Sequence, residues 1–371
     1  MQVADLARDA GEPESFRAIG MKHARTAVIV LLINLGVLLA AELAARWLHL
    51  PDRMNGFPRR TLLATDDPDL PYHLRPGVET YARGMNVRIN ELGLRGPTTT
   101  REPRPGVHRV LALGGSTTFG EGLEEEDSFP AALERELNAA GSACYEVLNA
   151  GVEGYNSTAE LAFLRQRGLP LQPRTVLVGF SLDDFQDSPV MGPYGVLTRT
   201  VEARVPTCSL GNASALYLSV YWFAKTGFTI PWHDLSAQRP TSNGPEFAEI
   251  DRKLARQRKQ TYRLKPNQQW EAMVEALHGF SHEAKAHGLR LLLVIIPDGD
   301  QVGVAEPDLH PQRKILAICA DAGLDCLDLQ PALDAAAAQE VVYFDGAHPN
   351  AAGQRVMARK VAEHLRAPAL D

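Results

Sequence analysis

A serine in a glycine-rich turn is the first feature of this sequence that can perform chemistry. Ser116 stands in the run Gly114-Gly115-Ser116-Thr117-Thr118-Phe119-Gly120, directly after the apolar stretch RVLAL. Glycines at the end of a strand let the backbone turn sharply and leave a hydroxyl exposed, as a nucleophile requires. The run is also compatible with a phosphate-binding turn or a plain strand-to-helix connection. It is not a Walker A loop, because no Gly-Lys-Ser/Thr follows.

An acid and a histidine stand three residues apart near the C-terminus, in Phe344-Asp345-Gly346-Ala347-His348-Pro349-Asn350. On one tight loop, Asp345 can hold one imidazole nitrogen of His348 while the other faces a nucleophile. This pairing supplies the base without which a serine hydroxyl is inert. The alternative is a histidine that caps the final helix, with Asp345 as a turn residue.

Both motifs must be positioned by the elements around them, and from about residue 107 short apolar runs alternate with amphipathic stretches. This pattern predicts a three-layer α/β/α sandwich with a five-stranded parallel sheet of the flavodoxin-like type. Ser116 follows the first strand and His348 precedes the last helix, and ligands bind at the carboxyl ends of parallel strands. We therefore expect the two side chains at one sheet edge. The strands are expected at 109–113, 145–151, 175–182, 289–296 and 324–329, and the helices at about 128–140, from the capping box Ser157-Thr158-Ala159-Glu160, at 267–287 and at 351–365.

Two stretches lack this rhythm. Residues 49–106 are rich in proline, glycine and short polar residues, and we predict an extended connector that covers one edge of the catalytic domain. The domain itself is expected over 107–368. Within it, residues at about 187–266 exceed the length of an ordinary loop and predict an insertion or lid beside the strand ends.

The motifs together resemble the SGNH (GDSL-like) hydrolase superfamily over about Val107 to Leu365. The serine loop looks like its first block, with glycine where many members have aspartate. The stretch from Asn149 to Ser157 resembles the second block, which implies that the Gly154 amide joins the Ser116 amide in an oxyanion hole. Asp345 to His348 matches the fourth block. The resemblance implies a serine esterase in which Ser116 attacks, His348 moves the proton and Asp345 orients His348, with no cofactor.

The third block departs from the family pattern. Ser181-Leu182-Asp183-Asp184 occupies the place of Gly-x-Asn-Asp, so Asp183 stands where an amide donor is expected. An ionised carboxylate there repels the oxyanion, and losing one donor costs about 2.7 to 4 kcal/mol. A protonated Asp183 can still donate, and Asn156 can substitute for it. Alternatively, Asp183 and Asp184 only cap the turn. We place Asp183 in the oxyanion hole, and we predict substrate contacts for Thr117, Tyr155 and Asn156.

An apolar segment lies near the N-terminus. Residues 27–41 carry no charge, and the apolar character continues to Leu50 with only Glu42 and Arg46 interrupting. We predict a transmembrane anchor over 27–48 after a cytoplasmic leader, 1–26. The uncharged part is shorter than the roughly 20 residues that a spanning helix needs, so a signal peptide and a buried core helix remain alternatives. A retained anchor is favoured because the leader is long and no Ala-x-Ala cleavage site follows.

Flanking charges do not decide the orientation of this anchor. A single early apolar helix ahead of a large soluble domain usually exports that domain. We therefore expect a single-pass protein of a bacterial inner membrane, with its catalytic domain outside the cytoplasm.

Composition removes some classes of function. The net charge is −7 and no long Lys/Arg run is present, which argues against a nucleic-acid partner. The four cysteines show no C-x-x-C spacing, so we expect no metal. In an oxidising compartment Cys319 and Cys326 can bridge a helix end to the next strand, but the sequence favours buried free thiols over the bridge.

The order of anchor, connector with Asn90-Glu91-Leu92-Gly93-Leu94-Arg95-Gly96 and serine loop is similar to bacterial membrane-anchored SGNH proteins. That resemblance implies an acylated, and specifically acetylated, envelope carbohydrate or lipid as substrate, and leaves room for a membrane partner that donates acyl groups. Three alternatives stay open: an O-acyltransferase with the same triad, a catalytically weak glycan-binding component, and a nucleotide-binding Rossmann protein. The last lacks G-x-G-x-x-G after the first strand and gives Asp345 and His348 no role.

Overall fold

The structure is a computed structural model of the 371-residue chain. It describes residues 14–48, 50, 61–82, 85–139, 141, 144–182, 184, 190–191, 197–198, 214–217, 219–220 and 268–367. Most of the predicted insertion at 187–266 lies outside these residues.

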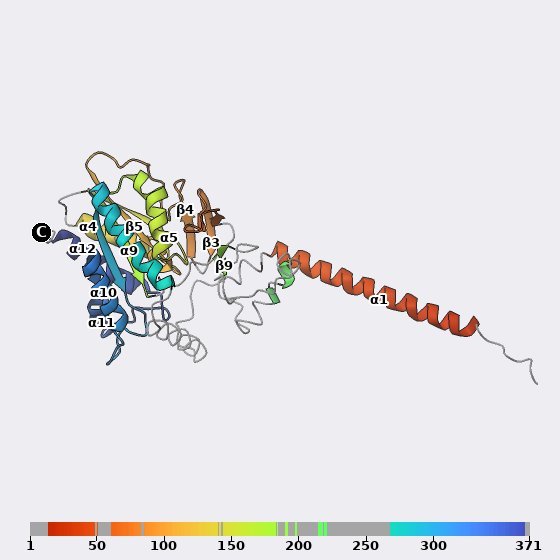
Figure 1. The fold of residues 1–371 in the computed structure, drawn as a ribbon. Helices are drawn as coiled ribbons and strands as arrows, with labels where there is room; N and C mark the ends of the chain where they lie inside the picture. Colours follow the sequence, from red (N-terminus) through yellow and green to blue (C-terminus); the bar gives the residue numbers. More distant parts are fainter. Residues whose placement is uncertain are drawn as a thin grey trace, which may run out of the picture.

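A five-stranded parallel sheet forms the centre of the molecule, as the alternating pattern predicted (Figure 1). Its order, β11-β10-β7-β5-β6, places the first strand of the unit inside the sheet. Because β5 has a neighbouring strand on both sides, the loop that follows it lies at the carboxyl end of the sheet, between the loops of those neighbours, and not beside an outermost strand. The strands are β5 (Val107–Gly114), β6 (Cys144–Gly151), β7 (Thr175–Ser181), β10 (Arg290–Ile296) and β11 (Asp325–Asp328).

Helices cover both faces of this sheet and complete the three layers. The side chains of a strand alternate between faces, so Leu111 and Leu113 of β5 join one apolar cluster while Val110 and Ala112 join the other. The first cluster includes residues of α5 (Ser157–Phe163), α9 (Gln268–His287) and α10 (His310–Ala322). The second includes residues of α4 (Phe129–Ala139), α11 (Gln330–Ala337) and α12 (Ala351–Arg366).

Smaller elements complete the described residues. The helix expected at Ser157 begins there, but its cap is Asn156, whose Oδ1 accepts a hydrogen bond from the Ala159 amide at 3.0 Å. The cap is therefore one residue earlier than predicted, and Ala159 rather than Glu160 stands three residues after it, so the predicted capping box is not formed. The remaining elements are α3 (Ser116–Phe119), the 3-10 helices Glu125–Asp127 and Leu169–Leu171, the π-helix Leu164–Gly168, and the short hairpin of β8 (Val190–Met191) and β9 (Leu197–Thr198).

The predicted connector is more than an extended cover. It forms two antiparallel hairpins, β1 (Leu62–Ala64) with β2 (Tyr72–Leu74) and β3 (Val78–Ala82) with β4 (Met85–Ile89). Alternate side chains of these hairpins are buried in the first apolar cluster. Arg95 then pairs with Asn149 on β6, the outermost strand of the sheet. The connector covers this edge, as expected, and also supplies part of the core.

A disulfide joins Cys319 at the end of α10 to Cys326 on β11, with 6.3 Å between the Cα atoms. The sequence analysis favoured two free thiols over this bridge, and the structure shows the bridge. The bridge ties the helix to the strand that follows it, and β11 is the other edge of the sheet.

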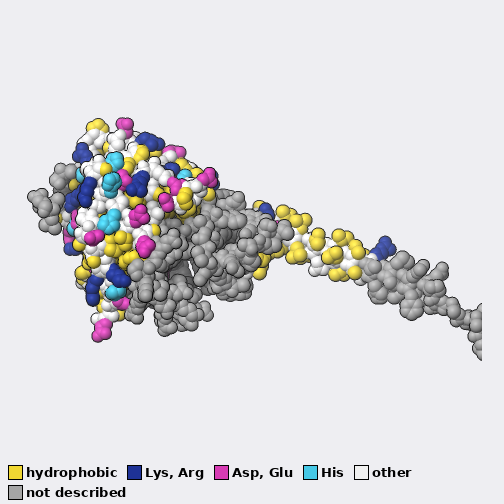
Figure 2. All heavy atoms as spheres, viewed as in Figure 1, with side chains coloured by type: hydrophobic (Ala, Val, Ile, Leu, Met, Phe, Trp, Pro, Cys, Tyr) yellow, Lys and Arg dark blue, Asp and Glu magenta, His cyan; other side chains and the backbone are white. Residues whose placement is uncertain are grey.

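One helix, α1 (Glu14–Trp47), extends away from the sheet (Figures 1 and 2). Its part from Arg25 to Trp47 is long and apolar enough to cross a membrane, and the apolar window is exposed along its length. Near its C-terminal end, Glu42 accepts hydrogen bonds from the Ser214 hydroxyl at 2.8 Å and from the Ala215 and Leu216 amides at 3.0 and 2.9 Å. The described part of the insertion therefore contacts the apolar helix directly.

Candidate active site

Ser116 opens the four-residue helix α3 at the carboxyl end of β5. Glycines let this short helix pack onto the strand ends. A Cβ on Gly114 or Gly179 would lie 2.0 or 2.3 Å from Thr118 Oγ1, and one on Gly151 would lie 2.2 Å from the Phe119 nitrogen. Gly114 also has φ of +155°. These three strand-end glycines make room for the turn that presents Ser116.

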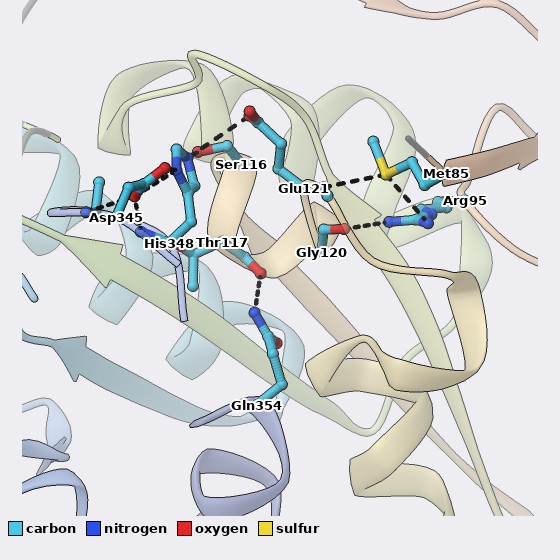
Figure 3. A network of polar contacts seen from close by, with 11 residues as sticks. Met85, Arg95, Ser116, Thr117, Gly120, Glu121, Asp345, His348 and Gln354 are labelled. Carbon is cyan, nitrogen blue, oxygen red and sulfur yellow. Dashed lines mark hydrogen bonds and ion pairs between the residues drawn. The ribbon is translucent and has the colours of Figure 1, made fainter. Parts of the chain in front are cut away.

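Ser116 and His348 contact each other at the carboxyl ends of the strands, although 232 positions separate them in the chain. Ser116 Oγ lies 2.9 Å from His348 Nε2, and both carboxylate oxygens of Asp345 lie 3.0 Å from His348 Nδ1 (Figure 3). With Nδ1–H donated to Asp345, Nε2 is left to accept the serine proton. The arrangement expected from the two motifs is present, and it can activate a serine hydroxyl for attack on an ester.

Asp345 also closes a turn, which is the structural role that the sequence analysis gave as the alternative to catalysis. Its Oδ1 accepts hydrogen bonds from the Ala347 and His348 amides at 2.9 and 2.8 Å, which closes the turn. Burial pushes the pKa of Asp345 upward, but the hydrogen bonds and charge of His348 and these two amides outweigh it and hold that pKa well below its ordinary value. The helix cap is supplied separately, by Asn350 on α12. Asp345 is therefore an ionised acceptor for His348.

Gly154 lies in the turn after β6, with φ of +77°. The next residue packs against the serine loop, since a Cβ on Gly115 would lie 3.4 Å from the Tyr155 carbonyl oxygen. Gly114 and Gly151 are neighbours in the β5–β6 register. The two amides assigned to the oxyanion hole, those of Ser116 and Gly154, thus belong to adjacent loops, and their role stays a prediction.

Asp183 lies outside the described residues. Its neighbour Asp184 is 2% exposed and closes a turn, with its Oδ1 accepting from the Ser181 amide at 3.2 Å and its Oδ2 from the Ser157 hydroxyl at 3.2 Å. The turn-capping role considered for this acidic pair therefore applies to Asp184.

The three predicted substrate contacts are placed differently from one another. Tyr155 is 5% exposed, its hydroxyl donates to the Tyr72 carbonyl, and burial raises its pKa well above the ordinary value. Thr117 is 3% exposed, and its carbonyl accepts from Gln354 at 3.1 Å. Both residues are almost fully buried, and the Tyr155 hydroxyl is already bonded within the protein. Their substrate contacts stay predictions. Asn156 is half-buried and caps α5, so its substrate contact stays a prediction.

Three further residues of the site were missed by the sequence motifs. Arg95 donates to the carbonyls of Phe119, Gly120 and Leu123, and Glu121 lies beside His348. Gln354 joins Thr117 to α12 (Figure 3). Arg95 belongs to the connector motif from Asn90 to Gly96, but the sequence analysis gave it no role at the site, because no local spacing relates it to Ser116. Glu121 stands between two glycines five positions after Ser116, which was the only available signal.

The described residues contain no group of three or more His, Cys, Asp or Glu side chains that could hold a metal ion. The chemistry assigned to the site below uses only side chains and backbone amides.

Comparison with known families identifies the protein family to which the chain belongs. The family model of the GDSL-like lipase/acylhydrolase family matches residues 112–356, more than half of the chain. The match includes Ser116, Asp345 and His348. The chain belongs to this family, and it is a carboxylic ester hydrolase of the SGNH type.

Comparison with solved structures finds similar chains at low identity. The acetylxylan esterase Axe2 from Geobacillus stearothermophilus is 12% identical, with a TM-score of 0.41 over 70% of this chain and 95% of its own. TesA is 17% identical, with a TM-score of 0.39 over 70% and 98%. A two-domain esterase active on acetylated mannans is 16% identical, with a TM-score of 0.39 over 70% and 49%. The comparison with curated proteins found no match.

Proposed function

We propose that this esterase is a membrane-anchored enzyme that removes acyl groups, and specifically acetyl groups, from an envelope carbohydrate or lipid outside the cytoplasm. The observation that carries the catalytic part is the contact of Ser116 Oγ with His348 Nε2 at 2.9 Å, with Asp345 on the opposite ring nitrogen. A serine, a histidine and an aspartate in contact in this order are suited to acyl-enzyme chemistry, and that chemistry needs no cofactor.

Each catalytic residue has a defined task in this proposal. Ser116 Oγ attacks the ester carbonyl carbon while its proton passes to His348 Nε2. The same proton then goes to the alcohol oxygen as the C–O bond breaks, and water repeats the sequence to release the acid. Asp345 holds the imidazole in the required tautomer, and the Ser116 and Gly154 amides, with Asp183 as a third group, face the oxyanion.

Location and substrate class rest on separate observations. The exposed apolar helix from Arg25 to Trp47 suits a membrane anchor. The Cys319–Cys326 disulfide suits an oxidising compartment, because disulfides are rare in the cytosol. The acetylated envelope substrate comes from the sequence resemblance to bacterial membrane-anchored SGNH proteins.

Hydrolysis of p-nitrophenyl acetate by the full chain in detergent tests the mechanism, with Ser116→Ala and His348→Ala as variants. We expect both variants to lose nearly all turnover and a serine-directed phosphonate to label wild type but not Ser116→Ala. If wild type and Ser116→Ala are equally inert, and the probe labels neither, the site is not an esterase centre, and a glycan-binding role takes its place.

Two additions to this assay address the remaining choices. Asp183→Asn restores the amide that the family has at this position and is expected to raise turnover by about 10²-fold if an ionised Asp183 weakens the oxyanion hole. Sugar alcohols added to the reaction distinguish transfer from hydrolysis, because transfer yields an acetylated sugar in place of free acetate.

A further inference from the structure

Glu121 brings a second carboxylate to His348. Its Oε2 lies 3.6 Å from His348 Nε2, the same nitrogen that faces Ser116. The side chain of Glu121 is 7% exposed and that of His348 is 19% exposed, so little water screens the interaction. With Asp345 on Nδ1, the imidazole lies between two acidic side chains from distant parts of the sequence (Figure 3).

The turn that ends α3 determines where Glu121 begins. Gly120 adopts the left-handed conformation with φ of +85°, and the Glu121 amide donates to the Ser116 carbonyl at 3.0 Å. Arg95 Nη1 donates to the Gly120 carbonyl at 2.8 Å from the other side. The backbone of Glu121 is thereby tied to that of Ser116, and both reach the same imidazole nitrogen.

We propose that Glu121 is a positioning residue that stabilises the protonated form of His348 and so determines the lower pH limit of the reaction. This inference rests on the proposed function, since it acts through His348 as the base. Nothing in the resemblance or the family match assigns a role to this position.

The chemistry follows from the charge on the ring. When Ser116 Oγ bonds to the ester carbon, its proton moves to Nε2, and the imidazolium formed lies between two carboxylates. When the C–O bond of the ester breaks, this proton passes to the departing alcohol oxygen. Glu121 exchanges no proton in either step. In the free enzyme, however, its negative charge also favours the imidazolium, which cannot accept the serine proton. The pH at which kcat/KM falls on the acid side is therefore higher than with Asp345 alone.

Other ionisable groups near His348 are arranged differently. Asp345 contacts Nδ1 and is retained in every variant below. Asp298 follows β10 and is 7% exposed. Tyr343 is neutral, because its burial and the negative charges of nearby acidic residues, Asp298 among them, hold its pKa well above the ordinary value. Asp184 bonds Ser157 and the Ser181 amide. Arg95 is bound to carbonyls behind the α3 turn. Among the described side chains, Glu121 is the carboxylate in contact with Nε2.

The test compares kcat/KM for p-nitrophenyl acetate across the acid range in the full chain, for wild type, Glu121→Gln and Glu126→Gln. Glu126 is an exposed residue of the 3-10 helix Glu125–Asp127, which follows the turn that holds Glu121, and its substitution removes the same charge away from the ring. In Glu121→Gln we expect the apparent pKa of the acid limb to fall by about one unit or more, because the neutral amide no longer favours the imidazolium. When each activity is expressed relative to its own plateau, this variant is then about tenfold or more above wild type at pH values well below both acid limbs. Glu126→Gln is expected to follow wild type.

An acid limb that Glu121→Gln leaves unchanged, while Ser116→Ala is inactive, overturns this inference and leaves the proposed function intact. Activity retained in Ser116→Ala overturns the proposed function itself. Glu121→Ala removes the charge without adding an amide and must show the same shift. A variant that is only misfolded loses activity at all pH values and cannot gain at acid pH, and thermal melts of both variants identify that case.

Discussion

His348 contacts an acid through one ring nitrogen and the serine through the other, and each contact has a different consequence. The Asp345 side determines which nitrogen carries the proton in the resting state. The Ser116 side determines where the proton comes from. Because the pKa of Asp345 is held well below its ordinary value, Asp345 stays ionised at mildly acidic pH and keeps its contact with the imidazole.

Replacing Asp345 by asparagine tests this division at the residue scale. Asp345→Asn is expected to lower kcat by a factor on the order of 10⁴, because the amide favours the wrong tautomer of His348. The initial rate of p-nitrophenyl acetate hydrolysis measures this. An activity within tenfold of wild type would show that Asp345 serves only the turn.

The same variant reports on stability. A carboxyl whose pKa is depressed in the folded state stabilises the protein above its unfolded pKa of about 3.9, and this contribution is lost as the pH falls through the folded pKa. The difference in unfolding free energy between wild type and Asp345→Asn should therefore be largest near neutrality and shrink in strong acid. A difference that does not vary with pH contradicts the assignment of the low pKa.

At the scale of elements, α3 is held from three directions. The strand-end glycines of β5, β6 and β7 lie beneath it, Gln354 of α12 bonds the Thr117 carbonyl, and Arg95 bonds its C-terminal carbonyls. Burial outweighs the nearby acidic residues and lowers the pKa of Arg95 to about 10, so the guanidinium remains charged at neutral pH. The connector is thus a structural part of the catalytic unit.

Arg95→Lys tests the contribution of this guanidinium. Lysine keeps the charge but cannot reach three carbonyls in a planar arrangement, so we expect the unfolding free energy to fall by about 3 kcal/mol and kcat to fall with it. Chemical denaturation and ester hydrolysis measure the two effects. Arg104→Lys, at an exposed position, is the matched control and should change neither the unfolding free energy nor kcat. Equal effects in the two variants would contradict the role assigned to Arg95.

The disulfide between α10 and β11 is a second element-scale feature. Cross-linking a loop this short constrains the unfolded chain by about 2–3 kcal/mol, and the bridge spans seven positions. Cys319→Ala combined with Cys326→Ala is expected to lower the melting temperature. Reductant should lower it in wild type but not in the double variant. A wild-type melt that reductant leaves unchanged would mean that the two cysteines are not bridged in the isolated protein.

For the whole molecule, the catalytic unit is joined to an exposed apolar helix by a direct contact, in which Glu42 receives three hydrogen bonds from residues 214–216. A contact of this kind favours a helix that stays with the mature protein over one that is cleaved away. The proposed function also includes an orientation, in which the esterase lies on the oxidising side of the membrane.

A C-terminal fusion to alkaline phosphatase tests that orientation, because the phosphatase is active only outside the cytoplasm. We expect full phosphatase activity and a chain that stays in the membrane after a carbonate wash. N-terminal sequencing of the purified protein separates the anchor from a signal peptide. A mature chain that begins after Trp47 would show cleavage, and an inactive fusion would place the esterase inside.

Local patterns determined a large part of this protein. The alternation of apolar runs with amphipathic stretches predicted five parallel strands and the helices α4, α5, α9 and α12, because burial on two faces leaves a periodic pattern in the sequence itself. The helices α3, α10 and α11 were not predicted. Ser116 and His348 were expected at one edge because each lies where its own element begins or ends. The bounds differ by one or two residues, as at β7 and α12.

Tertiary structure decided what depends on distances between segments far apart in the chain. The ring of Tyr155 packs between Tyr72 and Phe163 because the connector folds into hairpins over it, and no local pattern predicted this packing. The contact of Glu121 with His348 and that of Arg95 with the α3 turn leave no periodic trace, since each joins residues with no fixed spacing in the sequence. A sequence records which faces of its elements are apolar, whereas the partner of a single buried polar group is determined only when those elements pack.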